Sequence, residues 1–253
     1  MADSEFLCLG VLRHFQGFHA VGIDLANGEW ARLVGPRFSS ELSLGHLKVE
    51  GLGESRRMRP LDVVLVPLGA GVPKKHQPEN RILDRKATDR PMPLLRNAAK
   101  ERSLVKMIMD MAAASSKADL LYGSDETTNP DDKTERLQAS LLVVHSKHLM
   151  WSKTDEFRKG RFPELGQGPS LKGCFDFGKY PTRYCLPVGD VAFERDFGAS
   201  IPTDRSIEDS KLRSRTDPSF NLNILLTVSY DDDLMKVGHR YKFIVGVMAI
   251  PEL

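Results

Sequence analysis

Cysteine is scarce in this chain of 253 residues, in which Cys8, Cys174 and Cys185 are the three present. Their number is odd and no two have the CxxC spacing, so the sequence predicts neither a disulfide framework nor a cysteine-based zinc site. We expect all three to be buried small hydrophobic residues or free thiols.

Long hydrophobic runs are missing as well. No stretch reaches the roughly 18 uncharged apolar residues of a membrane span, and the start MADSEFLCLG lacks the basic residues that open a signal peptide. We therefore expect no membrane partner and a cytoplasmic location. The sequence also lacks a glycine-rich nucleotide loop and any regular alternation of strands and helices, which argues against a doubly wound α/β fold.

Catalytic and metal-binding motifs are hard to find. His145 and His148 lie in a stretch that indicates a strand, where they would point in opposite directions and could not share a zinc ion. Glu79, Asp84 and Lys86 are similar to the carboxylates and lysine of metal-dependent nucleases, but Pro78 and its polar neighbours indicate a loop. The sequence predicts no catalytic residue, metal or cofactor. A non-enzymatic protein is expected, with a metal-dependent nuclease as the alternative.

Positive charge, in contrast, is concentrated in one segment. Between Arg56 and Lys106 there are 13 Lys or Arg residues and five Asp or Glu residues, although the formal charge of the whole chain is only +2. An anionic partner should be drawn to this segment first.

Strand patterns dominate the chain. Residues 5–12 form an almost continuous apolar run, residues 20–25 alternate, and Asn27-Gly28 is a strong hairpin signal before Trp30 opens another strand. Residues 61–69 indicate a further strand. The stretch 93–114 combines an apolar stripe with a basic side, which predicts one amphipathic helix whose basic face could simply be solvated.

The polar, acidic segment 119–136 is the best candidate for a linker. It separates an N-terminal unit, 1–118, which holds the basic loop and the helix, from a C-terminal unit, 137–253. Strand signals resume in the second unit and end in a hairpin around Asp231 to Asp233. This predicts a mainly β protein of two OB-like five-stranded barrels, although the pattern alone does not separate these from SH3-like barrels or small sandwiches.

Several short motifs occur in a characteristic order: AVGI at 20–23, GEWAR at 28–32, QPEN at 77–80 and GCFDFGKYPTRYCLPVGD at 173–190. In this order the sequence resembles the bacterial dual OB-containing domain family over nearly its whole length. The resemblance implies two tandem OB folds. By analogy, it also implies binding of nucleic acid, a nucleotide or a protein partner, in a bacterial defence or mobile-element context.

OB folds bind single strands with aromatic stacking platforms and a basic track for the phosphates. Trp30, Phe15 and Phe18 are aromatic candidates in the first unit. The predicted nucleic-acid contacts are Arg13, Trp30, Arg32, Lys74, Lys75, Arg81, Arg85, Lys86, Phe175, Phe177, Lys179, Tyr180 and Arg183. Trp30 and the aromatic strand at 175–180 could equally belong to the core.

The centre of the QPEN segment has a second interpretation. Gln77, Glu79 and Asn80 can hydrogen-bond to backbone groups that a turn leaves unpaired, which would make them a polar lock. The leading hypothesis is a binding protein for single-stranded nucleic acid with weak sequence preference. The alternatives are a protein-interaction module that docks a partner or effector, and a binder of a nucleotide signal.

Overall fold

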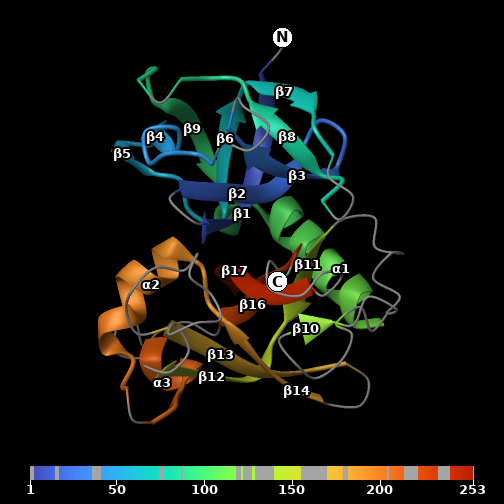
Figure 1. The fold of residues 1–253 in the computed structure, drawn as a ribbon, viewed down its shortest axis with the longest axis vertical. Coiled ribbons are helices and arrows are strands. Elements are labelled where there is room, and N and C mark those ends of the chain that lie inside the picture. The colour runs from blue at the N-terminus through green and yellow to red at the C-terminus, as the bar shows by residue number, and fades with distance from the viewer. Residues whose placement is uncertain are drawn as a thin grey trace.

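The computed structural model describes residues 3–14, 17–35, 41–73, 77–86, 88–117, 121, 127–128, 140–154, 170–178, 182–203, 205–213, 222–232 and 240–252. The chain is mainly β, as predicted, with two packed units that each contribute strands and helices (Figure 1). The described strands form one sheet of nine and two sheets of four.

The first unit starts with an antiparallel meander of β1 (Ser4–His14), β2 (Gly17–Asp24) and β3 (Glu29–Val34). The predicted hairpin at Asn27-Gly28 joins β2 to β3, with Gly28 at a φ of 74° that glycine adopts without strain. β1 pairs with β6 (Asp62–Val66), and β3 lies parallel to β8 (Asn80–Leu83).

One bent segment connects the two ends of this arrangement. β6 and β7 (Leu68–Gly71) are separated by Pro67 alone, and β7 pairs with β8. The segment therefore pairs with β1 at one end and with β8 at the other. The result is the partly open five-stranded barrel of the OB type.

A short hairpin and a further strand extend this sheet. β4 (Lys48–Gly51) and β5 (Glu54–Arg57) form the hairpin, and β9 (Met92–Asn97) lies between β4 and β6. The backbone N–H of Met58 donates to the carbonyl of Leu47 and closes the base of the hairpin.

The second unit repeats the pairing pattern. β11 (Leu141–His145) and β12 (Lys147–Thr154) are separated only by Ser146; β12 continues into a meander with β13 (Ser170–Phe177) and β14 (Thr182–Pro187). β11 pairs with β16 (Leu222–Asp232), which forms the predicted closing hairpin with β17 (Arg240–Pro251). A parallel bridge from Val188 to Ile244 then joins the end of β14 to β17.

The remaining elements of the second unit are short. β10 (Thr127–Thr128) pairs with β17, and β15 (Ile207–Glu208) pairs with β12. Two short helices, α2 (Val191–Phe197) and α3 (Asp209–Arg213), lie between β14 and β16. Most of the predicted linker 119–136 lies outside the described residues, so the domain boundaries stay a prediction.

The predicted helix at 93–114 is partly wrong. Residues 92–97 form β9, a 3-10 turn follows at Ala98–Lys100, and α1 covers Arg102–Lys117. Met92 and Leu94 are buried on either side of the exposed Pro93, which is the two-residue period of a strand. The helices α2 and α3 were not predicted at all.

Alternate residues of β1 enter two different cores, which explains its continuous apolar run. Phe6 and Cys8 belong to the core of the first unit. Leu7 and Leu9 belong to a shared core that includes α1 and residues of β11, β16 and β17. The two units therefore bury an apolar interface between them.

The closest crossing within that interface requires glycine. A Cβ atom at Gly246 would lie 1.8 Å from the carbonyl oxygen of Leu9, and one at Gly10 would lie 2.4 Å from the carbonyl oxygen of Val245. The backbones of β1 and β17 are thus almost in contact, and the hydroxyl of Thr227 donates to the Leu9 carbonyl at 2.8 Å.

The cysteine prediction is wrong for two of the three residues. Cys174 and Cys185 are directly opposite each other on β13 and β14 and form a disulfide. Their spacing in the sequence did not reveal this pair. The two cysteines meet because the register between β13 and β14 places them opposite each other. Cys8 is a buried free thiol, as expected. Among the helices of the described ranges, none has the length and apolar character needed to cross a membrane.

Candidate ligand-binding site

A pocket of about 250 Å³ lies between the two units. Its walls come from β1, β2, the segment that leads into β4, the end of β5, and α2. Figure 1 shows α2 on the same side of the molecule as the β4–β5 hairpin. Pockets at an interface between two folded units are common ligand sites.

The apolar part of the pocket is built by the first unit. Phe18 and Leu42 exchange two backbone hydrogen bonds of 2.8 and 2.9 Å, which hold the segment after residue 41 against β2. This places apolar side chains around the cavity, with Val191 of α2 opposite them: Val11, Phe18, Leu44, Leu47 and Met58. An apolar floor with a few polar groups at its edge is typical of small-ligand sites.

Three arginines line the same cavity: Arg13 from β1, Arg57 from β5 and Arg195 from α2. Arg195 is already engaged, because its guanidinium donates to both carboxylate oxygens of Asp196 at 2.7 and 2.9 Å. Within the described part of the chain, the guanidinium groups of Arg13 and Arg57 have neither an ion pair nor a hydrogen bond. One carboxylate, Glu194, also lines the cavity, so the arginines outnumber the acids.

Further cations face α2 from the hairpin side. Lys48 and Arg57 are directly opposite each other on β4 and β5. The pKa of Asp196 is lowered, mainly by its hydrogen bonds to Arg195 and to a smaller extent by the positive charge of Arg59. Arg59 is therefore close enough to act electrostatically on Asp196 of α2, and the hairpin side of the pocket is positive.

Asp190 fixes α2 in place. This buried carboxylate caps the helix by accepting from the N–H groups of Ala192 and Phe193, and it also accepts from Val247 of β17 at 2.7 Å. Burial raises the pKa of Asp190 to about 6, although the three backbone donors favour its charged form. On the opposite side, the N–H of Arg13 donates to the carbonyl of Gly189 at 3.3 Å, which ties β1 to the start of α2.

Arg32 does not contact solvent, so its prediction as a phosphate contact is corrected. Its side chain is 0% exposed and its Nε lies 3.2 Å from Glu79 Oε1. Its Nη2 donates to the hydroxyls of Ser140 and Ser229 at 2.8 Å, and Glu79 also accepts from the backbone N–H and the hydroxyl of Ser140. Arg32 and Glu79 thus join the first unit to β16 and to the residue before β11.

The QPEN segment is therefore a polar lock, but Glu79 bonds to Arg32 and Ser140 of distant segments and not, as the second interpretation predicted, to backbone groups of its own turn. Gln77, Glu79 and Asn80 are all buried, and the Asn80 amide donates to Gln77 Oε1 at 3.3 Å. Both oxygens of Glu79 accept hydrogen bonds, and its carboxylate forms an ion pair with Arg32.

The aromatic platform predicted in the second unit is also corrected. Phe175 and Phe177 point into the core of that unit and pack with Tyr184 at ring-centroid distances of 6.0 and 6.3 Å. Trp30 is half-buried and packs against the shared core. The rings of Phe175 and Phe177 are core residues because alternate positions on β13 face the barrel interior.

The other predicted cations that the structure describes differ in exposure. Arg85 is buried and donates to the carbonyls of Asp89 and Arg90, whereas Lys86 is exposed and Arg81 half-buried. Four predicted contacts lie outside the described residues: Lys74, Lys75, Lys179 and Tyr180.

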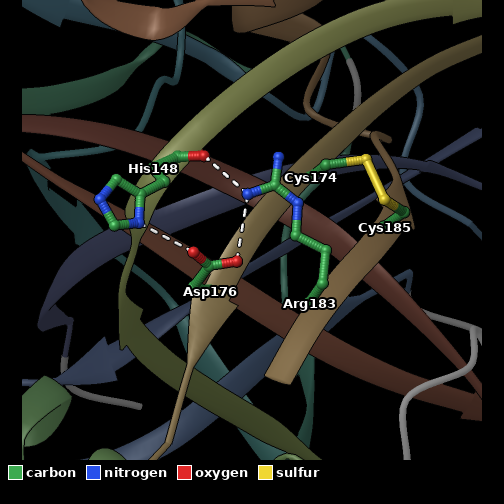
Figure 2. The surroundings of a disulfide bond; sticks show 5 residues. All are labelled: His148, Cys174, Asp176, Arg183 and Cys185. Carbon is green, nitrogen blue, oxygen red and sulfur yellow. Dashed lines mark hydrogen bonds and ion pairs between the residues drawn. A yellow bond between two sulfur atoms is a disulfide. The ribbon is translucent and has the colours of Figure 1, made fainter. Parts of the chain in front are cut away.

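Arg183 lies in a separate cluster beside the disulfide (Figure 2). Its guanidinium donates to Asp176 at 3.1 Å and to the carbonyl of His148 at 3.2 Å, while Nδ1 of His148 lies 2.8 Å from Asp176. The hydrogen bond to His148, followed by that to Arg183, lowers the pKa of Asp176. Since Asp176 already neutralises Arg183, this cluster offers little positive charge to an anion.

Arg13 and Phe18 are the sequence candidates that the fold brings together in the pocket. Sequence reasoning missed Arg195 because α2 was not predicted. The signals were present, however: Asp190 is a strong N-cap residue and Gly198 follows the helix. Arg57 belongs to the basic segment but had not been singled out.

The family comparison covers nearly the whole of this structure. The model of a family described as "dual OB-containing domain" matches residues 4–247. No curated protein and no solved structure matched the chain.

Proposed function

The chain belongs to the dual OB-containing domain family, and from this premise we propose that it is a non-enzymatic binding protein for single-stranded nucleic acid with weak sequence preference. The OB-type binding module itself follows from the family. The observation that supports nucleic acid as the ligand is the pocket between the units, where the unpaired Arg13 and Arg57 line the same cavity as several apolar side chains. This combination suits a polyanion that also carries flat apolar bases.

The proposed contact surface differs from that expected from the sequence. It follows the β4–β5 hairpin and the facing side of α2, with Arg13, Lys48, Arg57 and Arg59 as its cations. Arg32 and the aromatic residues of β13 are excluded because they are buried. A single strand is favoured over a duplex, since its bases can be splayed out and reach a recessed apolar surface.

The test is a titration of fluorescent single-stranded oligonucleotides at roughly 50 and 200 mM salt, a range over which phosphate-dominated affinity falls steeply. The Arg57→Glu variant should bind more weakly and show a shallower salt dependence. Arg102→Glu is the matched control, because Arg102 is also exposed but lies on α1, which does not line the pocket. If the wild-type chain fails to bind at the lower salt concentration, the proposal is wrong.

A protein-interaction module is the second candidate, and Leu52 is the observation that favours it. This leucine is 61% exposed at the tip of the β4–β5 hairpin, although its apolar side chain gains nothing from contact with water. Its φ of 54° is also uncommon for a residue other than glycine. A stoichiometric protein that copurifies after nuclease treatment and is lost in Leu52→Ser would support docking of a partner. A lone monodisperse chain would contradict it.

A cytoplasmic location is part of the proposal, and the disulfide gives it a test. Disulfides are rare in a reducing cytoplasm, so a cytoplasmic chain should have Cys174 and Cys185 reduced in the cell although they are bonded in this structure. Thiols trapped with an alkylating reagent at the moment of lysis report this state. Recovery of the oxidised pair would place the chain in an oxidising compartment instead.

A further inference from the structure

Resting on the proposed function, we infer that the pocket between the units receives one nucleotide of the bound strand. Its base lies on the apolar floor that includes Phe18 and Met58, and an adjacent phosphate lies between Arg13 and Arg57. The remaining nucleotides follow the positive hairpin side outside the pocket, where Lys48 and Arg57 are opposite each other.

The size of the pocket limits what it can hold. Its volume of about 250 Å³ is just below the range of roughly 300–1,000 Å³ that drug-sized ligands occupy. A cavity of this size cannot enclose a run of stacked bases. It is suitable for a single compact unit, and the rest of the strand must stay outside.

The lining of the pocket offers suitable partners to both parts of such a unit. Apolar side chains come from β1, β2 and the segment before β4, and a base buries its faces favourably against such a surface. Arg13 and Arg57 line the same cavity with unengaged guanidinium groups, whose planar forks match a phosphate well.

The geometry of α2 allows the pocket to be filled without a change in charge. Ala192 lines the cavity and is partly exposed, so Ala192→Leu should project into the space that we assign to the base. Ala199→Leu is the matched control, because Ala199 is exposed just beyond α2 and does not line the cavity. Circular dichroism verifies that both variants are folded.

The experiment measures the Kd of an oligonucleotide of about 12 nucleotides, within the site size of OB folds, by fluorescence anisotropy at roughly 50 mM salt. We expect Ala192→Leu to raise Kd about tenfold or more, the effect of losing one base contact, and Ala199→Leu to leave it unchanged. Equal Kd values for Ala192→Leu and the wild type would overturn the inference while leaving the proposed function in place. Absence of any wild-type binding would instead refute the proposed function.

A second arm changes the ligand and leaves the protein intact. An oligonucleotide of the same length made of abasic units keeps every phosphate but has no base to place on the floor. It should bind the wild-type chain about tenfold more weakly or worse. Equal affinity for the abasic and normal strands would show that the pocket holds no base.

Discussion

The buried ion pair between Arg32 and Glu79 leads to the most specific prediction for stability. Glu79→Gln preserves the shape of the side chain but leaves the guanidinium of Arg32, which is 0% exposed, without its counterion. It also replaces one carboxylate oxygen by an amide nitrogen, which is a donor only and cannot accept the hydrogen bond that this oxygen receives from Arg32 or from the N–H of Ser140. The change therefore weakens the connection between the two units at its centre.

The expected cost follows from the burial of the pair. Removing one partner of a buried ion pair typically costs about 3–5 kcal/mol, because the remaining charge is left unpaired. In a chain of this size, that corresponds to a fall in Tm of roughly 5–20 °C. Urea unfolding followed by circular dichroism measures the free energy of unfolding directly.

Two comparisons make the result interpretable. Lys106→Gln breaks an exposed i,i+4 pair with Asp110 on α1 and should cost no more than about 0.5 kcal/mol. The double variant Arg32→Met with Glu79→Gln should recover part of the lost stability, since it removes the unpaired charge. If Glu79→Gln costs no more than Lys106→Gln, the network does not hold the units together and our account of the two residues is wrong.

Three further predictions concern other parts of the fold. Reducing the Cys174–Cys185 disulfide, whose cysteines are 11 residues apart, should lower the free energy of unfolding by about 3 kcal/mol; unchanged urea midpoints with and without reductant would contradict this. Burial raises the pKa of Asp190 from its ordinary value of 3.8 to about 6 in the folded chain. The folded state therefore binds the proton more tightly than the unfolded state, and the free energy of unfolding falls as the pH rises between these two values. Between pH 4 and 6 the free energy of unfolding of the wild type should fall by up to about 3 kcal/mol relative to that of Asp190→Asn. If the free energy of unfolding has the same pH dependence in both proteins, the pKa of Asp190 is not raised. Gly246→Ala should destabilise the chain by about 1–3 kcal/mol or more, because the new methyl would overlap the carbonyl oxygen of Leu9. If this variant melts at the same temperature as the wild type, the backbones of β1 and β17 can move apart without a loss of stability.

Local patterns made much of the fold predictable. The hairpin at Asn27-Gly28 and the closing hairpin of β16 and β17 were both expected from alternation and turn residues. In both hairpins the signal lies within a few residues of the feature that it predicts. The polar centre of the QPEN segment was expected to bond backbone groups of its own turn, whereas Glu79 accepts from the N–H of Ser140, which is 61 residues away.

Features that depend on strand register could not be predicted in the same way. Whether Phe175 faces solvent or the barrel interior depends on which side of β13 is covered, and the alternating sequence is compatible with both. The pairing of Cys174 with Cys185 has the same origin. Arg32 looked like a surface cation because its partner Glu79 is 47 residues away in the sequence.

The candidate site combines both kinds of information. Arg13 and Phe18 were recognisable from their types, but their convergence with Arg57 and α2 depends on the packing of one unit against the other. No local pattern encodes that packing. The pocket therefore could be identified only after both units had been placed together.

The most direct test of the central claim is to locate the bound strand by photocrosslinking. An oligonucleotide that carries 5-iodouracil is irradiated in complex with the chain, and the crosslinked peptides are identified by mass spectrometry. We predict crosslinks at Phe18 and Met58, on the floor of the pocket between the units. Crosslinks confined to the second unit around β13 and β14, with none in the pocket, would contradict our account.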